Sequence, residues 1–247
     1  MDKISAVIIT YNEEKNIKRC LNSLIGVADE IIVLDSYSSD KTKTICEEFE
    51  VKFIESAWKG YSQSKNIANA HASNAYILSV DADEELSEAL KESILKAKER
   101  GLNGAYSFNR LSNYMGRWIR HGDWYPDRKM RIWNKNEGSW KGEIHEKVEF
   151  PVNVSIKHLK GDLNHYSYYS ISEHIEQINK YSTLSAEELY RKKKKVGFIK
   201  IVLSPWSQFF TSFVIKLGFL DGYKGFAISL ITSFGSYLKY AKLRAKY

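Results

Sequence analysis

The sequence AYILSVDADE, residues 75–84, joins a run of apolar residues to a cluster of acids and determines how the rest of the chain is interpreted. Its first six residues predict a buried strand, and Asp81, Asp83 and Glu84 follow where that strand ends. Two carboxylates one residue apart suit a divalent cation, because Mg²⁺ or Mn²⁺ takes oxygen ligands and fills its other positions with water and phosphate oxygens. The alternative is structural: Asp83 would cap the next helix, with Glu84 in its first turn.

Strands and helices alternate in the residues before this stretch. Apolar runs predict strands at 4–10, 30–34 and 51–54. Apolar residues at helical spacing predict three connecting helices, the first capped by Asn12 and the last covering about 62–72. Four strands that alternate with three helices indicate a mostly parallel α/β sheet.

Polar residues end three of the predicted strands: the run Thr10 to Glu13, then Asp35, then the acids at 81–83. Because ligands of such sheets bind at the carboxyl ends of the strands, we expect these groups to share one crevice. Asp35 suits a hydrogen bond from a uracil N–H or a ribose hydroxyl, or else it caps the next helix. Neither a dinucleotide fingerprint nor a P-loop is present, so holding phosphate would fall to the metal.

The composition fits one catalytic domain with a C-terminal addition. The 247 residues carry a net charge of +7, which predicts a partner such as nucleic acid, anionic lipid or a phosphorylated substrate. Cys20 and Cys46 both lie in predicted helices, so we expect no disulfide and a reducing cytosol. The N-terminus shows no pattern of a secretory signal peptide.

The middle third changes character. Strand-like pieces between residues 104 and 150 are interleaved with aromatic residues that suit a sugar ring or, alternatively, fill a core: Trp118, Trp124, Tyr125, Trp133 and Trp140. Arg128 and Arg131 are candidates to face a diphosphate or an anionic acceptor, or else lie on an exposed strand. His145 and Glu146 supply a group that binds metal or a proton and a group that acts as a general base; a satisfied core histidine is the alternative for His145.

The last third is predicted to be helical and partly apolar. A helix at about 172–195 ends in five cations, RKKKK at 191–195. The uncharged runs 201–215 and 225–238 follow, and both are shorter than the ~20 residues that span a bilayer. One face of the second run has the character of an interfacial helix, with Ala227, Leu230, Ile231, Phe234, Leu238 and Ala241. The alternative is a helical hairpin, turned at Asp221, that packs on the catalytic domain or on a second subunit.

In these motifs the chain resembles the inverting family 2 glycosyltransferases of GT-A fold, and in particular the bacterial lipopolysaccharide inner-core β-1,4-glucosyltransferases. The motifs that carry the resemblance are TYNEE (10–14), DSYSSDKT (35–42), SKN (64–66), DADE (81–84), WKGEIHE (140–146) and GFLDG (218–222). The resemblance implies a nucleotide site that includes Thr10, Tyr11, Asn12, Glu13, Asp35, Lys65, Asn66, Asp81, Ala82, Arg128 and Arg131. It also implies a metal at Asp83, helped by Asp81 and His145, and a catalytic carboxylate at Glu146.

We therefore expect a Rossmann-like GT-A domain over residues 1–165, with a nucleotide-sugar half at about 1–100 and an acceptor half at about 101–165. A helical, membrane-associating extension is expected over 166–247. The expected reaction is a metal-dependent (Mg²⁺ or Mn²⁺), inverting transfer of a sugar, glucose favoured, from a UDP-sugar to a hydroxyl of a membrane-borne glycolipid such as lipopolysaccharide core.

Glu146 is the expected base, with Asp123 and Asp127 as alternatives. An anionic membrane surface and a second copy of the chain are expected partners, with the protein peripheral on the cytoplasmic side of the membrane. A nucleic-acid-binding protein or a non-catalytic scaffold are the competing classes. We do not expect nucleic acid, because the cations adjoin apolar runs and the aromatics follow the acidic motif.

Overall fold

The computed structural model describes residues 1–142, 146–151 and 153–247. The chain forms two compact units. The α/β unit comprises residues 1–110 and 127–165, and the helical unit comprises 111–126 and 166–247. The segment 111–126 therefore belongs with the C-terminal helices, although it lies within the stretch expected to form the catalytic domain.

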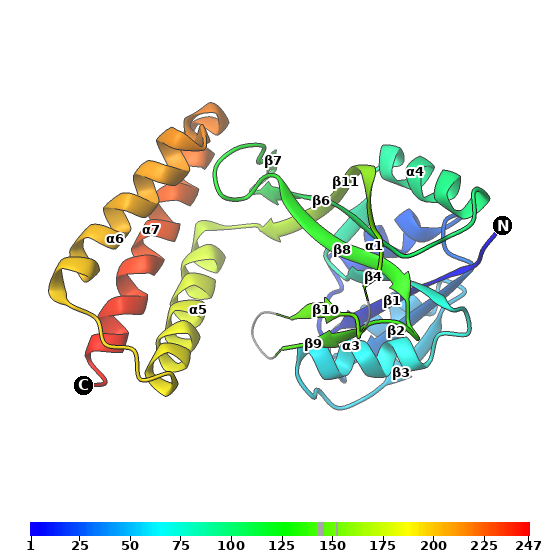
Figure 1. Cartoon of the computed structure of the whole chain (residues 1–247). Coiled ribbons are helices and arrows are strands. Elements are labelled where there is room, and N and C mark those ends of the chain that lie inside the picture. The colour runs from blue at the N-terminus through cyan, green and yellow to red at the C-terminus, as the bar shows by residue number, and fades with distance from the viewer. Residues whose placement is uncertain (143–145, 152) are drawn as a thin grey trace. The chain divides into compact units, whose positions relative to one another are not determined.

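The α/β unit begins with the predicted alternation (Figure 1). Its first four strands are parallel and lie in the order β3-β2-β1-β4: β1 (Ile4–Thr10), β2 (Glu30–Asp35), β3 (Lys52–Glu55) and β4 (Tyr76–Asp81). The connecting helices are α1 (Ile17–Leu24), α2 (Thr42–Cys46) and α3 (Tyr61–Ala70). The predicted parallel α/β sheet is confirmed.

The order of these strands positions the site. The chain places β2 and β3 on one side of β1 and then returns to place β4 on the other side. In the register, Thr10 lies opposite Asp35 and Ile9 lies opposite Asp81. This reversal is a topological switch point, and ligands of open α/β sheets bind in the crevice beyond the strand ends at such a point.

Antiparallel strands continue the sheet beyond β4 in the order β8-β6-β11-β5. The later strands of this sheet and the helix α4 have these bounds: β5 (Glu84–Leu86), α4 (Glu88–Glu99), β6 (Ala105–Tyr114), β7 (Arg117–Trp118), β8 (Asp127–Asn134) and β11 (Ile156–Tyr168). A separate antiparallel hairpin consists of β9 (Ser139–Lys141) and β10 (Lys147–Glu149). Ser87 caps α4, since its hydroxyl accepts from the N–H of Leu90, so the alternative in which Asp83 caps this helix is wrong.

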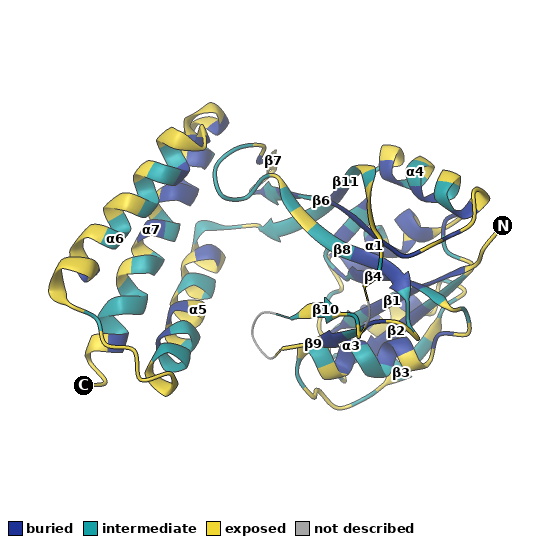
Figure 2. Ribbon diagram, in the orientation of Figure 1, coloured by how far each residue is buried: buried dark blue, intermediate teal, exposed yellow. Residues whose placement is uncertain are grey.

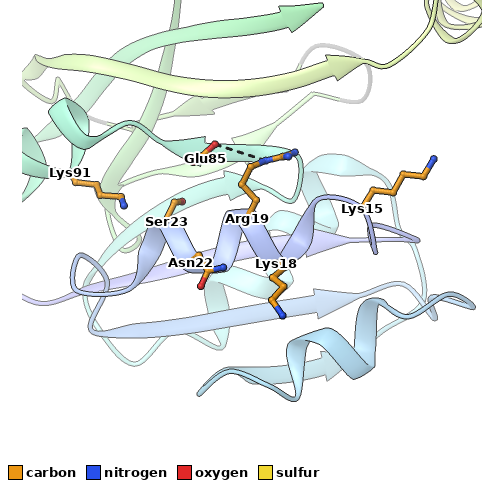
Figure 3. A pocket seen from close by; sticks show the side chains of 7 residues that line it. All are labelled: Lys15, Lys18, Arg19, Asn22, Ser23, Glu85 and Lys91. Carbon is orange, nitrogen blue, oxygen red and sulfur yellow. Dashed lines mark ion pairs between the residues drawn. The ribbon is translucent and has the colours of Figure 1, made fainter. Parts of the chain in front are cut away.

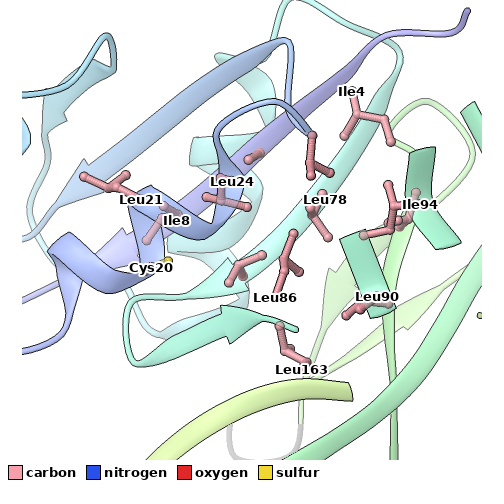
Figure 4. Packing of buried hydrophobic residues seen from close by; sticks show 14 of the residues in the cluster. Ile4, Ile8, Cys20, Leu21, Leu24, Leu78, Leu86, Leu90, Ile94 and Leu163 are labelled. Carbon is pink, nitrogen blue, oxygen red and sulfur yellow. The ribbon is translucent and has the colours of Figure 1, made fainter. Parts of the chain in front are cut away.

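Both faces of the central strands are buried, which explains their uninterrupted apolar sequences. Ile8 and Leu78 pack with α1 and α4 in one apolar cluster, as Figure 4 shows. Val7 packs on the opposite face with Trp133 and Trp140. These two tryptophans are buried core residues, so the expectation that they offer their faces to a sugar is wrong.

The helical unit contains three long helices. They are α5 (Ile171–Arg191), α6 (Phe198–Phe210) and α7 (Gly222–Arg244), with a π-helical turn η1 (Thr211–Ile215) and a 3₁₀ turn η2 (Gly218–Asp221) between the last two. α7 packs against both α5 and α6. On the face of α7 expected to be interfacial, Ala227 is buried, whereas Leu230 and Phe234 are exposed.

The predicted turn at Asp221 joins α6 to α7 and also holds the segment 111–126. The Asp221 carboxylate accepts from the backbone N–H of Arg120 (3.1 Å) and of His121 (2.8 Å). Asp123 of the same segment accepts from Lys216 Nζ at 2.7 Å and from Gln208 Nε2 at 2.6 Å. The GFLDG motif therefore has a structural role within the helical unit.

Candidate active site

Asp81, at the end of β4, lies between two cations. Its Oδ1 is 2.9 Å from Nζ of Lys65, and its Oδ2 is 2.9 Å from a guanidinium nitrogen of Arg131. Burial raises the pKa of Asp81, but Lys65 and Arg131 outweigh this effect and hold the pKa well below its usual value. Both carboxylate oxygens are thus engaged by the protein itself, and Lys65 and Arg131 are held side by side.

Arg131 reaches Asp81 because of a β-bulge. Tyr106 lies opposite Ile132 whereas the next residue, Ser107, lies opposite Met130, so Arg131 is the extra residue on β8. Bulges redirect side chains and are common beside active sites. Arg128, in the regular part of the same strand, is exposed and does not join the cluster.

Glu84 is the buried partner of Arg131. Its Oε1 is 2.5 Å from the Arg131 guanidinium and 3.7 Å from that of Arg110, and its Oε2 accepts from the N–H of Asp81 at 2.9 Å. Burial is the main cause that raises the pKa of Glu84, and Asp81 adds to it against the opposing effect of Arg131. Within the described chain, the Nε of Arg131 is buried and has no hydrogen-bond partner.

The β9–β10 hairpin brings Glu146 to the same cluster. Glu146 Oε1 lies 3.4 Å from Lys65 Nζ, and that nitrogen lies 4.6 Å from the centre of the Trp140 ring. Asn66 fixes the hairpin, because its amide both accepts from and donates to the backbone of Trp140 at 3.0 and 2.9 Å. Asn66 therefore positions the hairpin in this structure, while His145 lies outside the described residues.

Asp83 pairs with a histidine that is distant in sequence. The Asp83 Oδ2 to His165 Nε2 distance is 3.1 Å, and β11 places His165 opposite Glu84 of β5. Two ligands of one octahedral cation at about 2.1 Å each, at right angles, are about 3 Å apart, so this pair fits a divalent cation. No three acidic, histidine or cysteine side chains converge as a metal site within residues 1–142, 146–151 and 153–247, so substrate and water would complete the coordination.

The loops after β1 and β2 brace each other. Asn12 accepts from the N–H of Ser39 at 2.8 Å, and Thr42 accepts from the N–H of Glu13 at 2.8 Å. Asn12 has a positive φ of 54°, and the N-cap of α1 is Asn16, so the predicted capping role of Asn12 is wrong. The motifs TYNEE and DSYSSDKT thus form one bonded pair of loops.

These loops present polar and aromatic groups at the switch point. Asp35 is buried and accepts from the N–H and the hydroxyl of Ser38 at 2.7 and 2.5 Å, so it does not cap α2. The buried hydroxyl of Thr10 lacks a partner in the described residues, and Tyr11 is exposed. The hydroxyl of Thr10 is therefore enclosed, whereas the ring of Tyr11 is open to solvent.

Two other expected nucleotide contacts face the protein. The carboxylate of Glu13 accepts from Asn16 at 2.9 Å. Burial is the main cause that raises the pKa of Glu13, and Asp83, Asp40 and Asp81 raise it further. The side chain of Ala82 is buried in the core, so only its backbone is available to a nucleotide.

The sequence placed Glu84 among the acids without predicting its partner Arg131, and it did not predict Arg110 and His165 as site residues. Their positions depend on the antiparallel strands β6 and β11, whose pairing partners are far away in sequence. Arg110 directly follows the strand-like piece 105–109, and a charge at that position was the available signal.

A basic pocket on α1 is separate from this cluster (Figure 3). Its lining residues are Lys15, Lys18, Arg19, Asn22, Ser23, Glu85 and Lys91. Arg19 lies 3.9 Å from Glu85, and Lys18 lies 2.8 Å from Glu48. Glu85 and Glu84 are neighbours on β5 and so point to opposite faces of the strand, and none of the expected site residues lines this pocket.

Comparisons with known proteins agree with the fold and the motifs. The family profile described as Glycosyl transferase family 2 matches residues 5–151. An uncharacterized glycosyltransferase of Rickettsia bellii is 36% identical over 98% of this chain and 86% of its own length. The lipopolysaccharide core biosynthesis glycosyltransferase LpsC of Rhizobium meliloti is 27% identical over 97% of this chain and 91% of its own.

A solved structure of S. aureus TarS matches at a TM-score of 0.47 and 15% identity, covering 99% of this chain and 91% of that one. The family match covers more than half of the chain, and the Rickettsia bellii relative aligns along nearly all of it. The chain therefore belongs to glycosyl transferase family 2 and is a glycosyltransferase of GT-A fold.

Proposed function

We propose that this protein transfers a sugar, glucose favoured, from a UDP-sugar to a hydroxyl of a membrane-borne glycolipid such as lipopolysaccharide core, with inversion and with a divalent metal. One observation carries the proposal: Lys65 joins Asp81 to Glu146 at 2.9 and 3.4 Å, beside the pair Asp83 and His165, at the switch point of the sheet. The relationship to LpsC supports a lipopolysaccharide-core acceptor. In this proposal the protein works at the cytoplasmic face of the cell membrane.

The donor's nucleoside would bind at the ends of β1 and β2. The unpartnered hydroxyl of Thr10 and the carboxylate of Asp35 are opposite each other in the register and suit the polar edge of uracil or the ribose. The exposed ring of Tyr11 suits the face of the base. These contacts need no Gly-rich phosphate loop.

The diphosphate would lie against Lys65 and Arg131. Asp81 holds both cations, so they are already oriented before the donor binds and require little reorganisation when charge develops on the leaving diphosphate. Asp81 is therefore proposed to position these two side chains rather than to serve as the main metal ligand.

Asp83 and His165 would hold the metal. A bound cation would neutralise charge on the departing diphosphate. Because Mg²⁺ takes oxygen ligands, a nitrogen ligand such as His165 favours Mn²⁺.

Glu146 is the proposed general base. An inverting transfer needs a carboxylate that removes the acceptor proton and is not bound to the metal. Asp127 is paired with Arg110 at 2.8 Å and Lys129 at 3.0 Å, and Asp123 is held by Lys216 and Gln208. Among the described residues, Glu146 has one longer ion pair, to Lys65 at 3.4 Å, and its side chain is partly accessible.

The donor and metal sites are tested together by thermal shift with UDP-glucose and UDP-N-acetylglucosamine, each with Mn²⁺, with Mg²⁺ or with a chelator. A donor that binds only the folded state raises the melting temperature. We expect a shift with Mn²⁺ that Asp83→Asn and His165→Gln abolish, whereas His158→Gln, a matched change on the same strand, retains it. If the donor raised the melting temperature equally with Mn²⁺ and with the chelator, the metal assignment would be contradicted. It would also be contradicted if both site variants kept the parental rise.

A further inference from the structure

Helix α6 shows its apolar side to solvent. Ile199, Leu203, Trp206 and Phe210 recur at i, i+4, i+7 and i+11 and thus share one face. Their exposed fractions are 72%, 58%, 71% and 56%. The continuous segment Phe198–Ile215 is long and apolar enough to cross a membrane by length and composition, yet only 11% of it is buried (Figure 2).

The opposite face of α6 packs Phe209 on Phe226 of α7, and α6 and the following turn η1 add polar contacts. Ser204 and Ser212 bond the hydroxyls of Ser236 and Ser229 on α7 at 2.8 and 3.1 Å. Gln208, between them, donates to Asp123 at 2.6 Å. The inward side of α6 therefore combines apolar contacts with hydroxyl pairs, whereas its outward stripe is apolar and uncovered by the described protein. Packing through small hydroxyl side chains is typical of helices whose other face meets lipid.

The charge of this region matches an anionic surface. Residues 191–247 contain 12 of the 37 Lys and Arg residues but one of the 30 acids, Asp221. That acid is buried against the segment 111–126. The preceding 190 residues hold 25 cations against 29 acids, so the chain's net positive charge comes from the part that contains α6. Lys200 and Lys216 lie at the two ends of the apolar segment.

We propose that α6 is a monotopic anchor that lies in the plane of an anionic bilayer, with Ile199, Leu203, Trp206 and Phe210 inserted among the acyl chains and α7 as its support. This inference rests on the membrane location in the proposed function and identifies α6 as the element that binds the membrane. An in-plane position follows from the contacts. The side of the segment opposite the exposed stripe is bonded along its length to α7 and Asp123, so one side is covered by protein and the other is open.

The test is flotation of the full chain with vesicles of phosphatidylglycerol and phosphatidylcholine, at about 0.1 M and about 0.5 M salt. The anchor variant is Leu203→Ser/Trp206→Ser/Phe210→Ser. Because these side chains contact little protein, the variant should keep its circular dichroism and its donor thermal shift. We expect its vesicle partitioning to fall about 100-fold or more at both salt concentrations. Ile175→Ser/Tyr181→Ser, on exposed positions of α5, is the matched control and should bind as the parent does.

A second variant separates charge from insertion. Replacing Lys192, Lys193, Lys194 and Lys195 by Gln should weaken binding strongly at low salt and little at high salt, where surface charge is screened. Parental vesicle binding by the anchor variant would overturn the proposal. So would a lipid-free dimer of the parent that the anchor variant converts to monomer, because the stripe would then be covered by a second copy. Since donor binding is measured separately, failure of the anchor leaves the enzymatic proposal standing.

Discussion

At the scale of single residues, Asp81 organises the candidate site by holding Lys65 and Arg131. The adjacent acids have divided roles: Glu84 is buried under Arg131, and Asp83 is left to pair with His165. A carboxylate whose two oxygens both contact cations is a weak candidate ligand for a hard metal ion. Asp83 and His165, by contrast, have the spacing of two neighbouring ligands of one ion. The DADE motif thus combines a cation clamp with the proposed metal ligand Asp83.

This clamp predicts a pH-dependent contribution to stability. The folded-state pKa of Asp81 lies below the usual 3.8, so the contribution is present above pH 3.8 and is lost as the pH falls toward the folded value. Asp81→Asn should reduce the free energy of unfolding by about 3 kcal/mol at pH 7, because it leaves two buried cations with one partner fewer. Urea unfolding of the parent and of Asp81→Asn at pH 7 and pH 3 measures this loss of stability. If the two proteins differed in free energy of unfolding by the same amount at both pH values, the clamp would be contradicted.

The sequence predicted several of these residues but not their partners. Asp81, Asp83, Lys65 and Glu146 lie in motifs whose residue types indicate the chemistry. That Asp83 meets His165, or that a bulge aims Arg131 at Asp81, depends on strand pairings across large sequence separations. The spacing of residues along the sequence does not predict such pairings.

At the scale of elements, the continuous apolar runs of β1, β2 and β4 were sufficient to predict a parallel sheet, because strands buried on both faces have that signature. The apolar C-terminal runs were correctly predicted to be helices. The sequence did not predict that α6 would have an exposed apolar side. The packing shows that α7 lies between two helices while α6 has one exposed side. Helical periodicity alone does not tell which partner covers a face.

Helix α5 contributes a buried histidine that makes the helical unit sensitive to acid. His174 Nδ1 lies 3.1 Å from the Tyr114 hydroxyl, with the rings of Trp124 and Tyr168 around it. Burial lowers the pKa of His174 from 6.5 to about 4. The unfolded chain therefore binds the proton more readily, and stability should fall as the pH drops from 6.5 toward 4, by roughly 3 kcal/mol.

His174→Gln tests this assignment, because glutamine retains an acceptor for Tyr114 but does not titrate. Its free energy of unfolding, followed by tryptophan fluorescence in urea, should change less between pH 7 and pH 4 than that of the parent. Parallel profiles for the two proteins would contradict the role of His174.

At the scale of the whole molecule, the candidate site residues and the basic, apolar surface lie in different units. The α/β unit contains the acidic motif, the paired loops and Glu146, whereas the helical unit contains the cations and the exposed stripe of α6. Such a division suits an enzyme with a soluble donor and a membrane-borne acceptor. Catalysis and membrane binding are therefore tested by separate experiments.

The central claim is that Glu146 activates the acceptor hydroxyl beside a donor held by Lys65 and Arg131. The most direct measurement is the turnover of the nucleotide sugar by Glu146→Gln, with donor affinity measured on the same preparation. Because the amide keeps the size of the side chain but cannot take up the acceptor proton, kcat should fall by about 100-fold or more while donor affinity stays near the parental value. Parental turnover by Glu146→Gln, with Asp127→Asn or Asp123→Asn inactive, would contradict the account.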